Sequence, residues 1–213
     1  MSAREAREHG HHHWVSITAV LGGLLWIFYG VFEMLQPWGE DTEYRDDLNY
    51  EVITDTYLYL LYSVPGSLAL ILTAVSLVGI CRLLSRTSET VARISLVLGY
   101  ISVVLGGISL AGVIAGFDPV FTGPRIFGTL ALGAATLLAG MRARDNFSLP
   151  IRREALVGLG LLGLFLLPLW PLVYAVSVIP EWLGAMIIAL FGLGWIAIGY
   201  RLWPQHPGVP SPS

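Results

Sequence analysis

Long apolar runs without a charged residue alternate with short polar connectors along the chain. The run over residues 155–179 is the clearest, because it holds no Asp, Glu, Arg, Lys or His. It exceeds the length of about 20 apolar residues that a helix needs to cross the core of a bilayer. A helix of a soluble domain keeps a polar face, which this run lacks. The pattern therefore predicts a transmembrane helix.

Other runs along the chain follow the same pattern. The predicted spans cover residues 14–36, 57–81, 94–117, 126–141, 155–179 and 182–202. The span 126–141 is short for a full crossing, because turn and breaker residues, among them Pro119, Gly123 and Pro124, precede it. Residues 1–13 are expected to form a polar tail. Residues 203–213 are rich in Pro and Ser and are expected to form a disordered tail.

The first run could instead be a secretory signal peptide, with Arg4 and Arg7 as its basic flank. No small-residue cleavage site follows it, so we interpret it as a retained span. The expected fold is an all-α integral membrane protein, a bundle of six transmembrane helices over residues 14–202.

The arginines predict how this bundle is oriented. All twelve basic residues are Arg, and six spans place ten of them on the side of the two termini. The other two are Arg45 and Arg125. Because basic residues are enriched in cytoplasmic connectors, both termini are predicted to be cytoplasmic. The absence of Lys suggests a prokaryotic genome, so the expected location is a prokaryotic inner or plasma membrane.

Composition excludes several classes of protein and site. With 55% hydrophobic residues, 13% charged residues and a mean hydropathy of +0.69, the chain is too apolar for a soluble domain. Cys81 is the single cysteine, which excludes an intrachain disulfide. His9, His11, His12 and His13 could hold a divalent metal weakly, or form a titrating tail near anionic lipid. We expect no metal site and no cofactor.

The first and last spans share the pattern GLxWIxxG, whose Gly, Trp and Gly fall on one helix face. The matching residues are Gly23, Trp26 and Gly30 in the first span and Gly192, Trp195 and Gly199 in the last. Glycine lets helix backbones approach closely in lipid. Since the two spans run in opposite directions, these stripes could pack antiparallel and close the bundle. The alternative is a chance match among common residues.

Prolines interrupt two of the spans. Pro65 lies in the second, and Pro168 and Pro171 lie near the middle of the fifth. Each lacks an N–H donor and clashes with the carbonyl four residues before it. The positions predict either a hinge beside a hydrated cavity or a kink whose freed carbonyls are satisfied locally.

The sharpest candidate site is a shallow polar mouth at the outer end of the bundle. It would be formed by Glu33, Asp118, Arg125, Tyr29 and Tyr57. Charged groups near a bilayer are the best indicators of function, although these could simply lie among the lipid headgroups. No acid or base lies at the centre of a span, which argues against ion pumps and proton-coupled carriers.

The sequence contains no motif of an intramembrane hydrolase, a metalloprotease or a nucleotide-binding loop, so no enzymatic activity is expected. It also lacks a basic face for nucleic acid. Two functions remain open. One is a non-enzymatic membrane scaffold or accessory subunit, whose partners would be the lipid bilayer, other membrane proteins or a second copy. The other is a passive carrier or channel for an uncharged or amphipathic solute.

Overall fold

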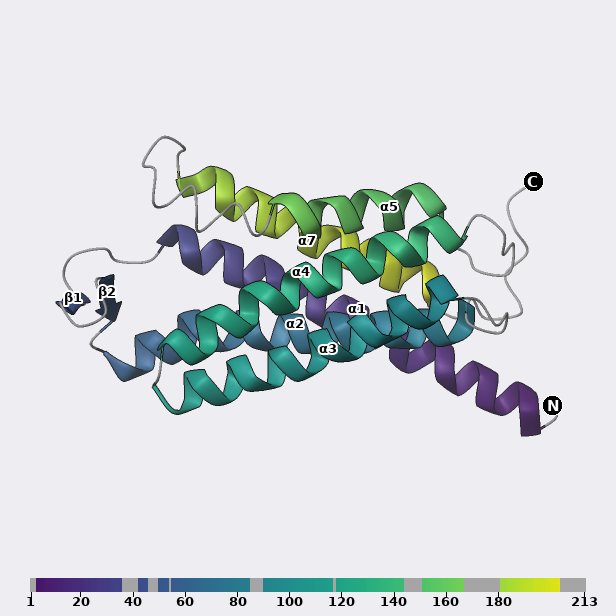
Figure 1. Cartoon of the computed structure of the whole chain (residues 1–213), viewed down its shortest axis with the longest axis horizontal. Helices are drawn as coiled ribbons and strands as arrows, with labels where there is room; N and C mark the ends of the chain where they lie inside the picture. The colour runs from purple at the N-terminus through teal and green to yellow at the C-terminus, as the bar shows by residue number, and fades with distance from the viewer. Residues whose placement is uncertain are drawn as a thin grey trace.

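A computed structural model describes residues 3–35, 42–45, 50–53, 55–84, 90–116, 118–143, 151–166 and 181–203. Helices make up nearly all of this part (Figure 1). In chain order the elements are α1 (Ala3–Leu35), β1 (Thr42–Arg45), β2 (Tyr50–Ile53), α2 (Thr56–Leu84), α3 (Thr90–Ile114), α4 (Asp118–Arg142), α5 (Arg153–Leu161), the π-helical turn η2 (Leu162–Leu166) and α7 (Glu181–Leu202).

Five of these helices are long and apolar enough to cross a membrane, counted over the described residues. They are α1, α2, α3, α4 and α7. The protein is therefore helical and multi-pass by length and composition, as the pattern of apolar runs predicts. The predicted fifth span is described only as far as Leu166, through α5 and η2. Its remainder, with Pro168 and Pro171, lies outside the described residues.

The fourth membrane helix begins earlier than the sequence indicates. The turn expected around residues 118–125 is helical, because α4 starts at Asp118 and runs through Pro124. Pro119 occupies the first turn, where a helix needs no N–H donor. The chain leaves α3 in a turn at residues 115 and 116, where Gly116 has a φ of 66° that favours glycine. The short span 126–141 thus belongs to a helix of 25 residues.

The outer connector contains a small β-hairpin that the all-α prediction misses. Strands β1 and β2 pair antiparallel, with Thr42 opposite Ile53 and Arg45 opposite Tyr50. β-branched and aromatic residues, which favour strands, recur among the acids of this connector. In β1, Thr42 and Tyr44 alternate with Glu43 and Arg45, and in β2 Tyr50 and Val52 lie on either side of Glu51.

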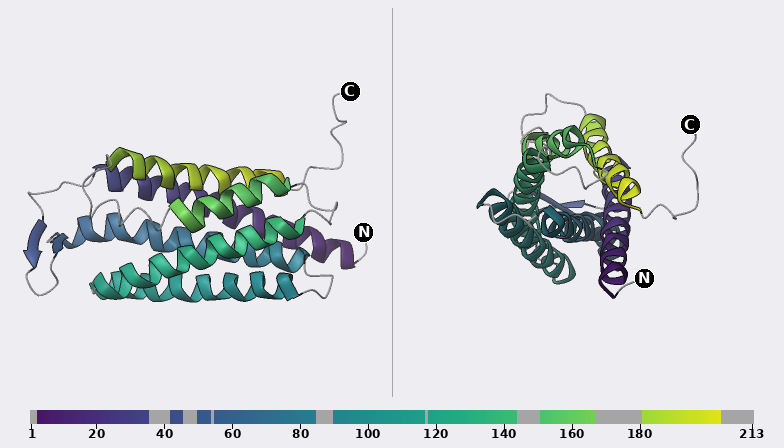
Figure 2. Two further views of the ribbon diagram at one scale, coloured as in Figure 1. Left: turned by 45° about the horizontal axis from the view of Figure 1, so that its top comes forward. Right: turned by 90° about the vertical axis from the view of Figure 1, so that its right-hand side faces the viewer.

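The helices lie side by side along one direction (Figure 2). The main contacts join α7 to α1, α1 to α2, α2 to α3, α3 to α4 and α4 to α5. Helix α2 also contacts α4. It is the most enclosed of the five membrane helices: 67% of the residues in its most apolar stretch are buried inside the bundle, against 33% for α3. The core therefore lies around α2, and α3 presents the most surface to its surroundings.

The ends of the helices separate the arginines. α1 begins, α2 ends, α3 begins, α4 ends, α5 begins and α7 ends at one end of the bundle (Figure 1). We call this the arginine end. Among the described residues it carries Arg4, Arg7, Arg82, Arg93, Arg142, Arg152, Arg153 and Arg201. The hairpin lies at the opposite end, near which Arg125 is placed in the first half of α4.

A heptad of small residues fixes α3 in the bundle. Its buried positions include Ala92, Ser95, Gly99, Ser102, Gly106, Ser109 and Val113. The alternating steps of three and four residues give a period of 3.5, the repeat of left-handed coiled coils. Small side chains at these positions let the neighbouring helices come close. Gly112 is also buried, whereas Gly116 lies in the turn after α3.

The serines of this heptad hydrogen-bond to the neighbouring helices. Ser95 donates to the Ala135 carbonyl at 2.7 Å, and Ser102 donates to the Gly128 carbonyl at 2.7 Å. Ser109 pairs with the Ser67 hydroxyl of α2 at 2.9 Å. A buried hydroxyl is costly unless it is hydrogen-bonded, so these bonds make serine compatible with the interior. They also link α3 to both α2 and α4.

Candidate functional site

Helices α1 and α7 meet backbone to backbone at Gly23 and Gly192. A Cβ added to Gly23 would lie 2.5 Å from the Gly192 carbonyl oxygen, and a Cβ added to Gly192 would lie 2.5 Å from the Gly23 carbonyl oxygen. No side chain larger than hydrogen fits at either position. The structure therefore brings the two GLxWIxxG stripes together, antiparallel.

The same contact recurs towards both ends of the pair. A Cβ on Gly30 would lie 2.8 Å from the Ala185 carbonyl oxygen, and a Cβ on Gly199 would lie 2.8 Å from the Ser16 carbonyl oxygen. The Ser16 hydroxyl donates to the Gly199 carbonyl at 2.5 Å. Three glycine contacts thus follow one another along α1 and α7. They join the first and last membrane helices of the chain.

Aromatic side chains fill the interior beside this contact. Trp26 and Trp195 are buried, with Phe191 between them at ring-centroid distances of 5.4 and 6.3 Å. The Trp26 indole N–H donates to the Thr73 hydroxyl of α2 at 3.4 Å. The Trp195 indole N–H has no hydrogen-bond partner within the described part of the chain. The two tryptophans of the motif therefore differ: Trp26 also links α1 to α2.

The structure brings together two of the five residues of the predicted polar mouth. The Arg125 guanidinium of α4 lies over the Tyr29 ring of α1, with its Cζ 4.8 Å from the ring centroid. Gly66 of α2 makes room for both, since a Cβ there would lie 3.1 Å from Tyr29 Cδ2 and 3.2 Å from Arg125 Nη1. Three helices thus meet at one cation–π contact. Tyr57 is 73% exposed at the start of α2.

The other two residues of the predicted mouth are Glu33 and Asp118. Glu33 and Asp118 belong to α1 and α4, but their side chains lie outside the described set. The described part of the mouth is therefore the pair Tyr29–Arg125, with Gly66 against it. It holds one cation against an aromatic ring, and Tyr29 is buried.

The prolines of the second and fifth spans have different surroundings. Pro65 lies inside α2 without ending the helix. The nearby Ser67 hydroxyl hydrogen-bonds across to Ser109 rather than within its own helix. In the fifth segment the α-helix changes to the π-helical turn η2 just before Pro168. Such turns mark interruptions of the regular hydrogen-bond ladder. Whether the prolines form a hinge or a satisfied kink stays a prediction.

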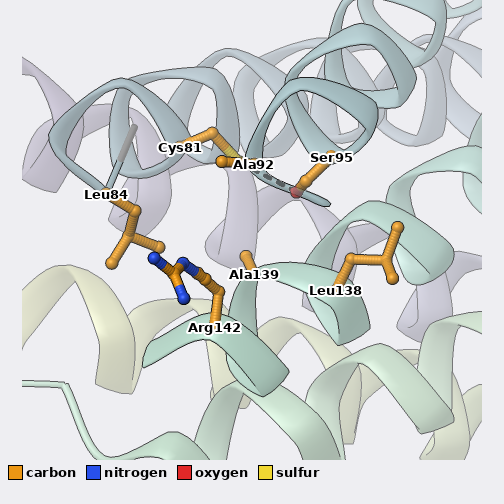
Figure 3. Close-up of a pocket in the computed structure, with 7 residues that line it drawn as sticks. All are labelled: Cys81, Leu84, Ala92, Ser95, Leu138, Ala139 and Arg142. Carbon is orange, nitrogen blue, oxygen red and sulfur yellow. Dashed lines mark hydrogen bonds between the residues drawn. The ribbon is translucent and has the colours of Figure 1, made fainter. Parts of the chain in front are cut away.

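A small pocket lies near the arginine end, between α2, α3 and α4 (Figure 3). It is lined by Cys81, Leu84, Ala92, Ser95, Leu138, Ala139 and Arg142. The Cys81 thiol and the Ser95 hydroxyl share a hydrogen bond of 3.1 Å. The centre of a water molecule can move within about 10 Å³ of the pocket, which is roughly enough room for one water. The pocket is therefore too small for an organic solute.

The Tyr29–Arg125 contact can be tested by removing the cation. Arg125→Gln is expected to lower the stability of the purified protein by about 0.5–2 kcal/mol, because it removes the charge over the ring. Arg152→Gln, at an exposed position of the arginine end, is the control and should change little. Thermal melting in detergent measures both. Equal melting temperatures for the wild type and Arg125→Gln would show that the contact contributes nothing.

The described interior thus consists of close backbone contacts, aromatic packing and hydrogen bonds between helices. Within the described residues there is no group of three or more His, Cys, Asp or Glu that could hold a metal ion. The described Arg, Asp and Glu side chains lie towards the helix ends rather than mid-helix. Comparison of the chain with protein-family models, with curated proteins and with solved structures finds no match.

Proposed function

We propose that the chain is a non-enzymatic scaffold or accessory subunit of a prokaryotic inner or plasma membrane. Close packing of the described interior carries this proposal. Backbones touch at Gly23 and Gly192, and again where a Cβ on Gly133 of α4 would lie 2.5 Å from the Leu164 amide nitrogen. Helices packed this closely form a rigid body, which suits a structural role.

The use of the buried hydroxyls points the same way. Ser76 of α2 donates to the Val15 carbonyl at 2.9 Å, and Ser16 donates to the Gly199 carbonyl. Ser95 and Ser102 donate to carbonyls of α4. A solute path would require polar groups turned towards a wet cavity. Here these groups hold helices together instead.

Six crossings with cytoplasmic termini form part of the same proposal. Helix α5 begins at the arginine end and α7 begins at the opposite end (Figure 1). The chain between Arg153 and Glu181 therefore passes from one end to the other, which supports a sixth crossing there. Clustering of the described arginines at one end supports the cytoplasmic assignment of that end.

The second candidate is a passive carrier or channel for an uncharged or amphipathic solute. Pro65 inside α2 and the π-helical turn Leu162–Leu166 favour it, because irregular helices can line a path. Both candidates take lipid as the main partner. Only the scaffold needs another membrane protein or a second copy.

Reconstitution into liposomes separates the two candidates. Proteoliposomes and empty liposomes should shrink and recover at equal rates in gradients of glycerol or urea if the protein is a scaffold. A pore-forming peptide is the positive control. Solute entry that rises with the amount of protein would contradict the scaffold and support the carrier.

The scaffold also requires that a mild extract of native membranes contain the chain in a complex larger than one copy with its lipid.

A further inference from the structure

Two arginines and a tyrosine gather on the outside of the bundle at the arginine end, where α2 meets α3. Arg82 lies in the last turn of α2 and is exposed, and Arg93 is exposed in the first turn of α3. Tyr100 of α3 is 41% exposed. The Arg82 Nη2 donates to the Tyr100 hydroxyl, and its Cζ lies 5.8 Å from the centroid of the Tyr100 ring. Tyr100 therefore holds the Arg82 guanidinium against α3.

The packing of α2 on α3 places the backbone of the second arginine at about the level of the first. The hydrogen bond between Cys81 and Ser95 brings these turns of the two helices together. Arg82 follows Cys81 and Arg93 lies two residues before Ser95. The Cα atoms of the two arginines therefore lie at a similar level along the helix axes. Arg93 and Tyr100 are seven residues apart and share one face of α3. Together Arg82, Arg93 and Tyr100 form what we call the Arg–Tyr cluster.

The surface next to this cluster is apolar. Ile94, Val97, Ile101 and Val104 are large hydrophobic residues exposed on the outside of α3. In a bilayer such residues contact acyl chains. The cluster therefore lies where an apolar face meets the end of a membrane helix. A phospholipid has the matching arrangement, with its charged headgroup at the interface and its chains along the helix.

Charge and donor chemistry select the headgroup. Residues 82–93, from the last turn of α2 to the first turn of α3, hold three arginines, Arg82, Arg86 and Arg93, and a single acid, Glu89. Guanidinium groups bind phosphate oxygens with paired N–H donors. The Tyr100 hydroxyl accepts a bond from Arg82, so its own hydrogen remains available to donate. Basic sites between membrane helices bind anionic lipid headgroups in this way.

We propose that the Arg–Tyr cluster binds the phosphodiester headgroup of an anionic phospholipid such as phosphatidylglycerol, with the acyl chains lying beyond Tyr100 along the exposed Val104 and Ile108. Arg82 and Arg93 neutralise the headgroup, and Tyr100 positions Arg82. The site depends on the bundle lying in a membrane and on neither candidate function. The proposal is the same for either orientation of the bundle in the membrane.

Native mass spectrometry of the full chain in detergent, with added phosphatidylglycerol or phosphatidylcholine, tests this site. The wild type is expected to retain phosphatidylglycerol in preference to phosphatidylcholine. Arg82→Gln combined with Arg93→Gln should reduce the retained fraction by about tenfold, corresponding to about 1.4 kcal/mol. Tyr100→Phe keeps the ring and should cause a smaller loss. The control combines Arg152→Gln with Arg201→Gln, which removes the same charge elsewhere at the arginine end and should retain the lipid.

Three results would overturn the proposal. One is equal retention of the two lipids by the wild type. Another is an equal loss in the Arg82/Arg93 and Arg152/Arg201 variants, which would indicate attraction to total charge rather than a site. The third is an unchanged preference in the Arg82/Arg93 variant. Melting of each variant without added lipid identifies any that fail to fold, and the single Arg93→Gln variant then replaces the double one.

Discussion

Gly192→Ala is expected to destabilise the bundle by about 3 kcal/mol or more, because the added methyl group would lie 2.5 Å from the Gly23 carbonyl oxygen. Backbone cannot rotate away as a flexible side chain can, so α1 and α7 must separate. Gly23→Ala should have a similar effect, since the contact is reciprocal. The measurement is thermal or SDS-induced unfolding of the purified protein in detergent micelles.

Gly107→Ala on α3 is the matched control for this prediction. An added Cβ there meets no atom within 4 Å, and the position is exposed. It makes the same chemical change in a membrane helix and should be neutral or slightly stabilising, because alanine is the better helix former. If Gly192→Ala and Gly23→Ala unfold at the same point as Gly107→Ala, the α1–α7 contact does not close the bundle.

The second large effect is expected at the contact between α4 and α5. A Cβ on Gly160 of α5 would lie 2.6 Å from Leu137 Cα, and one on Gly133 would lie 2.5 Å from the Leu164 amide nitrogen. Gly160→Ala should therefore destabilise the protein by about 2–3 kcal/mol and release α5 from α4. Two measurements would detect that release: faster cleavage next to α5 in limited proteolysis, and a lower melting temperature.

Gly158→Ala provides the comparison on the same helix. It lies two residues away, is exposed, and would meet nothing within 4 Å. Its melting and proteolysis should match those of the wild type. Matching behaviour of Gly160→Ala would mean that α5 does not pack against α4 in the membrane.

The spans were the part of this fold most open to prediction. The bilayer core requires charge-free runs of sufficient length, so the long apolar helices α1, α2, α3, α4 and α7 could be expected without knowledge of the packing. The shared GLxWIxxG pattern placed two glycines on one face of each helix, and glycine lets helix backbones approach closely in lipid. Gly23 and Gly192 could be named from sequence for that reason.

Other features depended on context that single residues do not carry. Pro119 and Pro124 look like turn residues, yet the first is tolerated in the opening turn of α4 and the second within the helix. The strand pairing of Thr42 with Ile53 was not predicted, because the segment around these residues is rich in Asp and Glu, which strands disfavour. The Ser–Gly heptad of α3 could have been found from its period of 3.5, but serine is rarely counted as a core residue.

The candidate sites divide in the same way. Sequence proximity to the outer end suggested Tyr29, Tyr57 and Arg125 together, although only Tyr29 and Arg125 make a contact among these described side chains. The Arg82–Tyr100 bond joins residues 18 positions apart on two helices. Such a pair needs the register of α2 against α3, which the sequence alone leaves open.

Cysteine accessibility in intact cells tests the proposed orientation most directly. In a Cys81→Ala background, single cysteines at Thr56, Arg152 and Arg201, all exposed positions, would be treated with a membrane-impermeant maleimide. We expect labelling of the Thr56 site from outside, and labelling of the Arg152 and Arg201 sites only after the membrane is permeabilised. Labelling of the Thr56 and Arg152 sites from the same side would contradict the six-crossing bundle with its arginines in the cytoplasm.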